Sequence, residues 1–172
     1  MQIVAIQDAN IIIDLIKIEL FSSCLRLPYR FVTTNLILYS ELNEQQVAIA
    51  EAHIQAQQFT LITISDEDFA AILIEAKTDR RLSEQDWSAY YYAQKLNGIL
   101  LTGDDRLRKK AEANGISVCG ILWVLDELLG KNIITTTGAF DYLTDLMQKN
   151  KRLPKKDCEA RLREWGKESG EK

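Results

Sequence analysis

Short apolar runs rich in β-branched residues alternate along this chain with stretches whose apolar residues recur at helical spacing. Runs of the first kind predict strands over Ile3–Gln7, Arg30–Thr33, Phe59–Ile64, Gly98–Thr102 and Ile116–Cys119. The amphipathic stretches predict helices over Ile11–Leu20, Leu36–Leu42, Gln45–Gln57, Asp68–Thr78, Glu84–Leu96, Arg106–Ala113, Leu122–Leu129, Ala139–Lys149 and Cys158–Trp165. Strands separated by helices favour a parallel sheet with right-handed crossovers. We therefore expect the α/β class, a three-layer α/β/α sandwich around a central, mostly parallel sheet of about five strands.

The last part of the chain differs in charge from the rest. From Lys149 onward it carries nine Lys and Arg against five Asp and Glu, a net charge of +4, whereas residues 1–148 carry a net −8. Pro154 interrupts the helical pattern in the same region. We therefore expect one domain over residues 1–150, followed by a basic helical appendage over residues 151–172.

Composition adds few restrictions. A hydrophobic fraction of 47% and a charged fraction of 27% are ordinary for a globular chain with a full core. No apolar run approaches the roughly 20 residues that cross a bilayer, and the first residues lack the basic start of a signal peptide. The three cysteines show no CxxC spacing. These features predict a cytoplasmic protein without a membrane partner.

Acidic residues stand at four separate junctions of the predicted elements. Asp8 ends the first apolar run, Glu41 lies late in a helix, Asp86 opens another helix, and Asp104 follows the fourth strand. In an open parallel sheet the carboxyl ends of the strands converge on one crevice. Carboxylates that meet there without basic partners repel one another, and a divalent cation neutralises them. The pattern indicates a metal-dependent phosphodiesterase.

Each acid also has a purely structural interpretation. Asp8 could cap the helix that follows it. Ser83 and Asp86 have the spacing of a capping box, and Asp104 falls at a helix start, where the helix dipole favours negative charge. Glu41 lies too late in its helix for that role and could be a solvated glutamate.

Several stretches carry a resemblance to a known family, and it spans roughly residues 3–130. They are Ile6–Asn10, Tyr39–Leu42, Leu82–Asp86, Ile99–Arg108, Gly115–Ile116 and Ile121–Leu128. The most specific is Thr102-Gly103-Asp104 with its downstream Leu107. In these segments the chain resembles a PIN domain, the nuclease fold of VapC-like toxins.

The resemblance implies that Asp8, Glu41, Asp86 and Asp104 form a catalytic metal site for Mg²⁺ or Mn²⁺. Residues beside these ligands would orient them or metal-bound water; they are Asn10, Thr102 and Asp105. Either Asp104 or Asp105 could point inward, and the motif spacing favours Asp104. Arg106 and Arg108 could hold substrate phosphates, although a basic solvated helix face explains them equally well.

The predicted function is that of a metal-dependent endoribonuclease, the toxin of a type II toxin–antitoxin pair. The expected partners are an RNA substrate, an antitoxin protein and a second copy of the chain in a homodimer. Two alternatives stay open from the sequence. One is a housekeeping RNA-processing or single-strand nuclease, and the other is a non-catalytic α/β protein-interaction module whose acids are only helix caps.

Overall fold

A computed structural model of the chain describes residues 2–169. The chain forms two compact units, each built from two segments. Of the described residues, the first unit comprises 2–13 and 28–120, and the second comprises 14–27 and 121–169.

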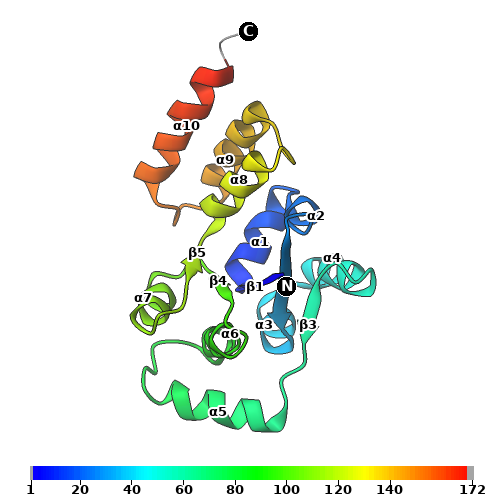
Figure 1. Cartoon of the computed structure of the whole chain (residues 1–172), viewed down its shortest axis with the longest axis vertical. Helices are drawn as coiled ribbons and strands as arrows, with labels where there is room; N and C mark the ends of the chain where they lie inside the picture. The colour runs from blue at the N-terminus through cyan, green and yellow to red at the C-terminus, as the bar shows by residue number, and fades with distance from the viewer. Residues whose placement is uncertain (1, 170–172) are drawn as a thin grey trace. The chain divides into compact units, whose positions relative to one another are not determined.

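The first unit contains a parallel sheet whose strands follow the order β3-β2-β1-β4-β5. Strands β1, β3, β4 and β5 are labelled in Figure 1. The strands are β1 (Ile3–Gln7), β2 (Tyr29–Thr34), β3 (Thr60–Ile62), β4 (Ile99–Leu101) and β5 (Val118–Cys119). Every neighbouring pair in this sheet is parallel. The predicted α/β class with a central parallel sheet is confirmed.

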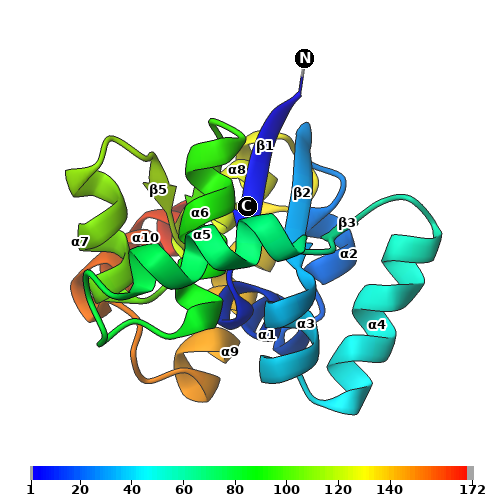
Figure 2. The same ribbon diagram turned by 90° about the horizontal axis from the view of Figure 1, so that it is seen from below.

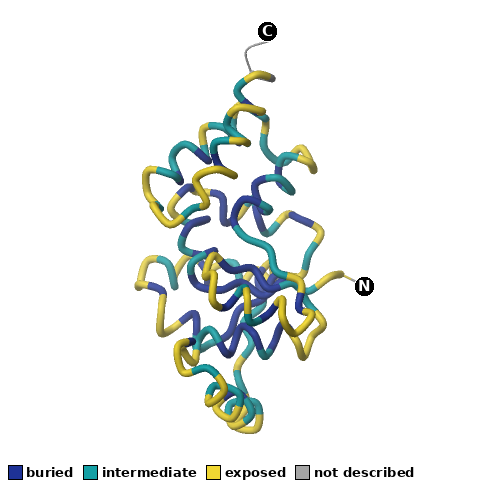
Figure 3. Tube along the Cα trace, turned by 90° about the vertical axis from the view of Figure 1, so that its left-hand side faces the viewer, coloured by how far each residue is buried: buried dark blue, intermediate teal, exposed yellow. Residues whose placement is uncertain are grey.

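Both faces of the central strands are covered. Ala5 and Ile6 are adjacent in β1 and therefore point to opposite faces of the sheet, yet both are 0% exposed. Phe31 and Val32 repeat this pattern in β2, with 1% and 0% exposed. Figure 3 draws the buried stretches of the chain in dark blue. Continuous apolar runs of this kind are typical of parallel strands between two helical layers, and the fold belongs to the predicted three-layer α/β architecture.

Five helices belong wholly to the first unit of the described chain. They are α3 (Asn35–Glu41), α4 (Glu44–Gln55), α5 (Asp66–Ala76), α6 (Glu84–Lys95) and α7 (Asp105–Ala113). Helix α6 packs against β1, β2 and β4 and also contacts α3, α5 and α7 (Figure 2). It buries Trp87, Ala89, Tyr90 and Ala93, so its first turn is held firmly beside the sheet.

The strands at the two edges are shorter than the sequence predicts. The expected strand Phe59–Ile64 is reduced to Thr60–Ile62, and Ile116–Cys119 is reduced to Val118–Cys119. Each edge strand pairs with only one neighbour. Residues beyond that pairing have no ladder partner, so apolar content alone overstates the strand length.

The second unit is helical. It holds the last part of α1 (Ala9–Lys17) together with α2 (Phe21–Cys24), α8 (Ile121–Gly130), α9 (Thr136–Lys149) and α10 (Lys155–Ser169). Helix α10 packs on α9 and buries Cys158 and Trp165. Arg161 of α10 also binds Asp126 of α8 through a guanidinium–carboxylate pair with a shortest distance of 2.6 Å. The domain boundary at residue 150 stays a prediction.

The single helix expected over Ile11–Leu20 is wrong. Helix α1 ends at Lys17, and Glu19 adopts a left-handed conformation with φ 58° before α2 begins at Phe21. The Leu20 N–H donates to the Leu15 carbonyl at 2.8 Å and closes this turn. Because no Gly or Pro marks the break, the apolar pattern runs through it.

No helix in the described part of the chain has both the length and the apolar character needed to cross a membrane.

Candidate active site

Strand β1 is the point in the sheet at which the strand order changes direction. Strands β2 and β3 lie on one side of β1, and β4 and β5 lie on the other. Such a reversal leaves a crevice beyond the carboxyl ends of the strands, where open α/β sheets bind ligands. The register pairs Gln7 of β1 with Leu101 of β4. The next residues, Asp8 and Thr102, therefore lie side by side at the carboxyl end of the sheet, and the Asp8 N–H donates to the Leu101 carbonyl at 3.0 Å.

Asp8 is a buried carboxylate held by neutral donors. It is 2% exposed. Its Oδ2 accepts hydrogen bonds from the Thr102 hydroxyl at 2.7 Å and the Asn10 amide at 2.6 Å. Its Oδ1 accepts the Ala9 N–H at 2.9 Å. Burial raises the pKa of Asp8 to about 6, and the negative charge of Asp86 adds to the increase, although the three hydrogen bonds oppose it.

This pattern of contacts differs from that of a helix cap. A capping side chain accepts the N–H of the second or third helical residue, whereas Asp8 accepts the N–H of Ala9, the first residue of α1. The backbone carbonyl of Asp8, and not its side chain, accepts the N–H groups of Ile11 and Ile12. The carboxylate is therefore directed elsewhere.

Asn10 and Thr102 connect the ends of β1 and β4 through their side chains. Besides bonding Asp8, Asn10 accepts the Gly103 N–H through Oδ1 at 2.7 Å. The Thr102 hydroxyl donates to Asp8 and accepts the Asp104 N–H at 3.0 Å. The hydroxyl thus links the first and last of the predicted acids.

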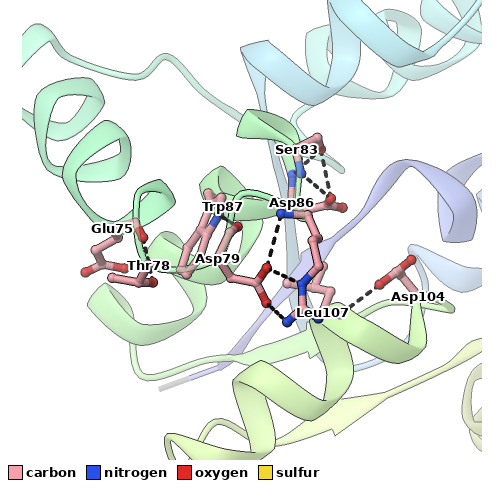
Figure 4. Close-up of polar contacts among 9 residues, drawn as sticks. Glu75, Thr78, Asp79, Ser83, Asp86, Trp87, Asp104 and Leu107 are labelled. Atoms are coloured by element: carbon pink, nitrogen blue, oxygen red, sulfur yellow. Dashed lines mark hydrogen bonds and ion pairs between the residues drawn. The ribbon is translucent and has the colours of Figure 1, made fainter.

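Asp86 lies in the first turn of α6 and takes part in the predicted capping box. The N–H and hydroxyl of Ser83 donate to its Oδ2 at 2.8 and 2.9 Å, and the Asp86 N–H donates back to the Ser83 hydroxyl at 3.1 Å (Figure 4). The structural interpretation of Asp86 is therefore correct. It is compatible with a second role, because the charge of Asp86 also acts on Asp8 and Glu41.

Glu41 is the last residue of α3 and is exposed as a whole residue. Partial burial of its carboxyl group raises its pKa to about 7, and the negative charges of Asp8 and Asp86 add to this. Three carboxylates from three separate elements therefore share one electrostatic environment. We refer to Asp8, Glu41 and Asp86 as the carboxylate cluster.

Two buried hydroxyl residues position the helices of this cluster, and the sequence reasoning missed both. The Thr34 hydroxyl, at the end of β2, accepts the Ile37 N–H and so caps α3. It also shares a 2.9 Å hydrogen bond with the hydroxyl of Ser88 in α6. Both residues are 0% exposed. The helix that carries Glu41 is thereby joined to the helix that carries Asp86. The available signal was a second threonine, Thr34, directly after the predicted strand Arg30–Thr33.

The remaining predicted acids lie at the start of α7. Asp104 is its N-cap and accepts the Leu107 N–H through Oδ1 at 2.7 Å (Figure 4). Asp105 is the first residue of the helix, and both acids are exposed. Asp104 is linked to Asp8 through the Thr102 hydroxyl. The carboxylate of Asp104 is not among the charges that raise the pKa of Asp8 or Glu41.

The donor chemistry of the carboxylate cluster fits a hard divalent cation. All its donors are carboxylate oxygens, which Mg²⁺ prefers. Among the described residues, no Lys or Arg forms an ion pair with these three acids. Across residues 2–169, no three Asp, Glu, His or Cys side chains converge closely enough to hold one ion. Like charges disfavour such convergence until a cation neutralises them.

The two arginines predicted to contact substrate differ in their surroundings. Arg108 is half-buried and donates to the main-chain carbonyls of Thr102 at 3.2 Å and Val118 at 3.3 Å. It thus ties α7 to the ends of β4 and β5. Arg106 is exposed in the first turn of α7, and its positive charge acts on Asp79.

Comparison with known families assigns the chain to one of them. A family model described as a PIN domain matches residues 4–167. No curated protein gives a match. The matched segment includes both segments of the sheet-containing unit almost completely and extends through most of α10. The chain belongs to the PIN-domain family, a family of nucleases.

Proposed function

We propose that this PIN-domain protein is a Mg²⁺- or Mn²⁺-dependent endoribonuclease and the toxin of a type II toxin–antitoxin pair. The observation that supports this most strongly is the carboxylate cluster. Its members come from the end of β1, the end of α3 and the start of α6. The charge of Asp86 raises the pKa of Asp8, and the charges of Asp8 and Asp86 raise the pKa of Glu41. Among the described residues, none of the three pairs with a Lys or Arg. A site that holds negative charge at such a cost is suited to bind a divalent ion.

Asp8, Glu41 and Asp86 would hold the ion, and Asp104 would complete the site. A bound divalent cation supplies the positive charge that polarises a phosphodiester and activates water for its hydrolysis. Asn10 and Thr102 fix the orientation of the Asp8 carboxylate through their hydrogen bonds to Oδ2. Asp86 is oriented in the same way by Ser83. Both carboxylates are therefore preorganised before any ligand arrives.

RNA as the substrate and an antitoxin as the partner are proposals that follow from the resemblance to VapC-like toxins. A toxin of this kind would be inhibited when a partner protein covers the crevice beyond β1 and β4. A housekeeping nuclease would carry the same cluster but would not require such an inhibitor. The identity of the neighbouring gene separates these two roles, because an antitoxin is a small protein expressed together with its toxin.

The test is a cleavage assay with purified protein and a mixed pool of cellular RNA. We expect cleavage with Mg²⁺ or Mn²⁺, complete loss of cleavage with excess EDTA, and recovery when the metal is added back. A parallel assay with single-stranded DNA tests the preference for RNA. Undiminished cleavage in EDTA would reject the metal-dependent mechanism, and an inactive protein under all metal conditions would favour the non-catalytic interaction module.

A further inference from the structure

The loop between α5 and α6 holds an arginine in a fixed position on the surface. The Arg81 guanidinium donates to both carboxylate oxygens of Asp79, from Nε at 2.7 Å and from Nη2 at 2.8 Å. The Arg81 N–H also donates to Asp79 Oδ1 at 3.1 Å. The side chain of Arg81 nevertheless stays 69% exposed, whereas that of Asp79 is 15% exposed. The loop thus orients a guanidinium toward solvent instead of covering it.

The loop itself is anchored to the core of the unit. The indole N–H of Trp87, a residue 1% exposed, donates to the Asp79 carbonyl at 3.3 Å. The Leu82 N–H donates to the same carbonyl at 3.3 Å. Asp79 is therefore held through its main chain while its side chain holds Arg81. The loop leads directly into Ser83 and Asp86, so Arg81 lies shortly before one member of the carboxylate cluster in the chain. Figure 4 shows Asp79 of this loop together with Asp86.

Most of the hydrogen-bonding capacity of Arg81 is not used by the protein. A guanidinium has five N–H donors, and in the described structure Asp79 takes two of them. The other three are in the planar arrangement that matches the oxygens of a phosphate. Because Asp79 already restricts the side chain, a ligand would not bear the full entropic cost of ordering a free arginine.

The charges around this loop favour an anionic ligand. Residues 77–81 and 105–110 together contain seven of the 21 Lys and Arg of the chain and only two Asp. The two segments are neighbours, because the positive charge of Arg106 acts on Asp79 and the Lys110 Nζ lies 5.4 Å above the Trp87 ring. The chain as a whole carries a net charge of −4. Positive charge is therefore concentrated beside α6, where the carboxylate cluster would otherwise repel a polyanion.

We propose that Arg81, together with Arg106, forms a subsite for a backbone phosphate of single-stranded RNA bound across the carboxylate cluster. The proposal rests on the proposed nuclease function and names the residues that hold the substrate there. Arg81 contacts a phosphate through its three remaining N–H groups, and Asp79 acts as the positioning residue that keeps the guanidinium in place. Arg108 is excluded from this subsite because its guanidinium binds the carbonyls of Thr102 and Val118.

The test compares Arg81→Gln and Arg81→Lys with wild type and with a matched control, Arg30→Gln. Arg30 is an exposed arginine of the same unit. It lies near the amino end of β2, whereas the carboxylate cluster lies beyond the carboxyl ends of the strands. Its replacement removes the same charge. Binding of fluorescein-labelled single-stranded RNA is measured in EDTA at several salt concentrations, and kcat and KM are measured with Mn²⁺. Thermal melting confirms that each variant folds.

We expect Arg81→Gln to weaken RNA binding about tenfold and to raise KM by a similar factor, with kcat nearly unchanged. The slope of log affinity against log salt should fall by about 0.7, the value for one lost phosphate contact on a single strand. Arg81→Lys should keep the salt slope but bind RNA more weakly than wild type, because an ammonium group lacks the planar set of N–H donors with which a guanidinium matches a phosphate. Arg30→Gln should match wild type.

Equal binding by Arg81→Gln and Arg30→Gln would overturn the subsite. If wild type still cleaved RNA in that case, the nuclease proposal would stand alone. A second set of measurements with single-stranded DNA of the same sequence addresses the opposite case, in which the subsite is real but the protein is not a ribonuclease. DNA binding that depends on Arg81, without RNA cleavage, would support the phosphate subsite and reject the ribonuclease. A wild-type protein that binds neither nucleic acid would reject both.

Discussion

Two groups of carboxylates in the sheet-containing unit have opposite electrostatic properties. Asp8 accepts three hydrogen bonds, all from neutral donors, and its pKa is raised to about 6. Asp68, which joins α5 to α6, accepts hydrogen bonds from Lys95, Tyr92 and Tyr91, and its pKa is lowered to about 2. Both carboxylates are well supplied with donors, so the number of hydrogen bonds does not explain the difference.

The difference comes from burial and from the presence of a cation. Asp8 is 2% exposed and has another carboxylate, Asp86, in its field. Asp68 has the ammonium group of Lys95 at 2.6 Å and keeps contact with water. A carboxylate paired with a cation, such as Asp68, stabilises the folded state. A buried carboxylate without a cation, such as Asp8, destabilises it unless a positive charge binds nearby. The comparison therefore separates acids that serve the fold from acids that are suited to a ligand.

The largest expected effect distinguishes the two groups by activity. We expect Asp8→Asn to reduce metal-dependent RNA cleavage by about 1000-fold, because losing a ligand of the charge-stabilising ion should cost at least as much as losing one oxyanion-hole donor. Asp68→Asn, the same chemical change in a paired carboxylate, should keep cleavage within about threefold of wild type, since Asp68 binds Lys95, Tyr91 and Tyr92 and is not part of the carboxylate cluster. Cleavage rates at saturating RNA and Mn²⁺ provide the measurement. Similar losses in both variants would mean that the two groups of acids do not differ in function.

The second prediction concerns stability against pH in the metal-free protein. The folded-state pKa of Asp8, about 6, lies above its ordinary value of 3.8. Between these values the folded state keeps a proton that the unfolded state has lost, so the free energy of unfolding falls as pH rises. The full loss from Asp8, above pH 6, is on the order of 3 kcal/mol. Glu41, with a pKa of about 7, extends the decline in the same direction.

Denaturant unfolding in EDTA at a series of pH values between 4 and 7.5 measures this decline. Asp8→Asn should remove most of it between pH 4 and 6, and at pH 7.5 the variant should be at least as stable as wild type. A wild-type stability that stays level or rises across this window, or an unchanged slope in Asp8→Asn, would contradict the assignment of a buried, uncompensated charge to Asp8.

The smallest expected effect is at Asp68, whose contribution to the free energy of unfolding changes with pH in the opposite direction to that of Asp8. Its folded-state pKa is below the ordinary value, so its contribution is complete above about pH 4 and is lost as pH falls toward 2. Because solvent screens this pair, we expect Asp68→Asn to lower the free energy of unfolding at pH 7 by only about 1 kcal/mol. The loss should disappear when unfolding is measured near pH 2. A variant as stable as wild type at pH 7 would remove Asp68 from the acids that hold the fold.

Much of the fold could be predicted because the strands and helices have distinct periods. The central strands show it best: Ile3–Gln7 was predicted without error, because Ile3–Ile6 is a continuous apolar run, as expected where neighbouring residues such as Ala5 and Ile6 are buried on both faces. The break after Lys17 could not be predicted, because a left-handed turn at Glu19 needs no Gly when hydrogen bonds close it. The edge strands were overestimated, since their length depends on a single neighbouring strand.

The sequence indicated the acids of the candidate site, whose role in metal binding stays a prediction, but it did not indicate the contacts that support them. Spacing and resemblance identified Asp8, Glu41 and Asp86, which the fold brings into one electrostatic environment. The Thr34–Ser88 hydrogen bond joins residues 54 positions apart, and a threonine beside a predicted strand does not show which distant residue it will contact. Arg81 was missed for a similar reason. Its role depends on Asp79 and on a neighbouring helix, and a single sequence does not reveal which surface arginine is held in place.

The central claim is that the carboxylate cluster binds a divalent ion, and thermal melting with and without Mn²⁺ tests it most directly. For wild type at pH 7.5, saturating Mn²⁺ should raise the melting temperature relative to EDTA by roughly 5 to 10 °C, the shift expected for an ion at about 100 times its Kd. Asp68→Asn should show the same shift, and Asp8→Asn should show little or none. Equal Mn²⁺-induced shifts in wild type and Asp8→Asn, or no shift in wild type, would contradict the account.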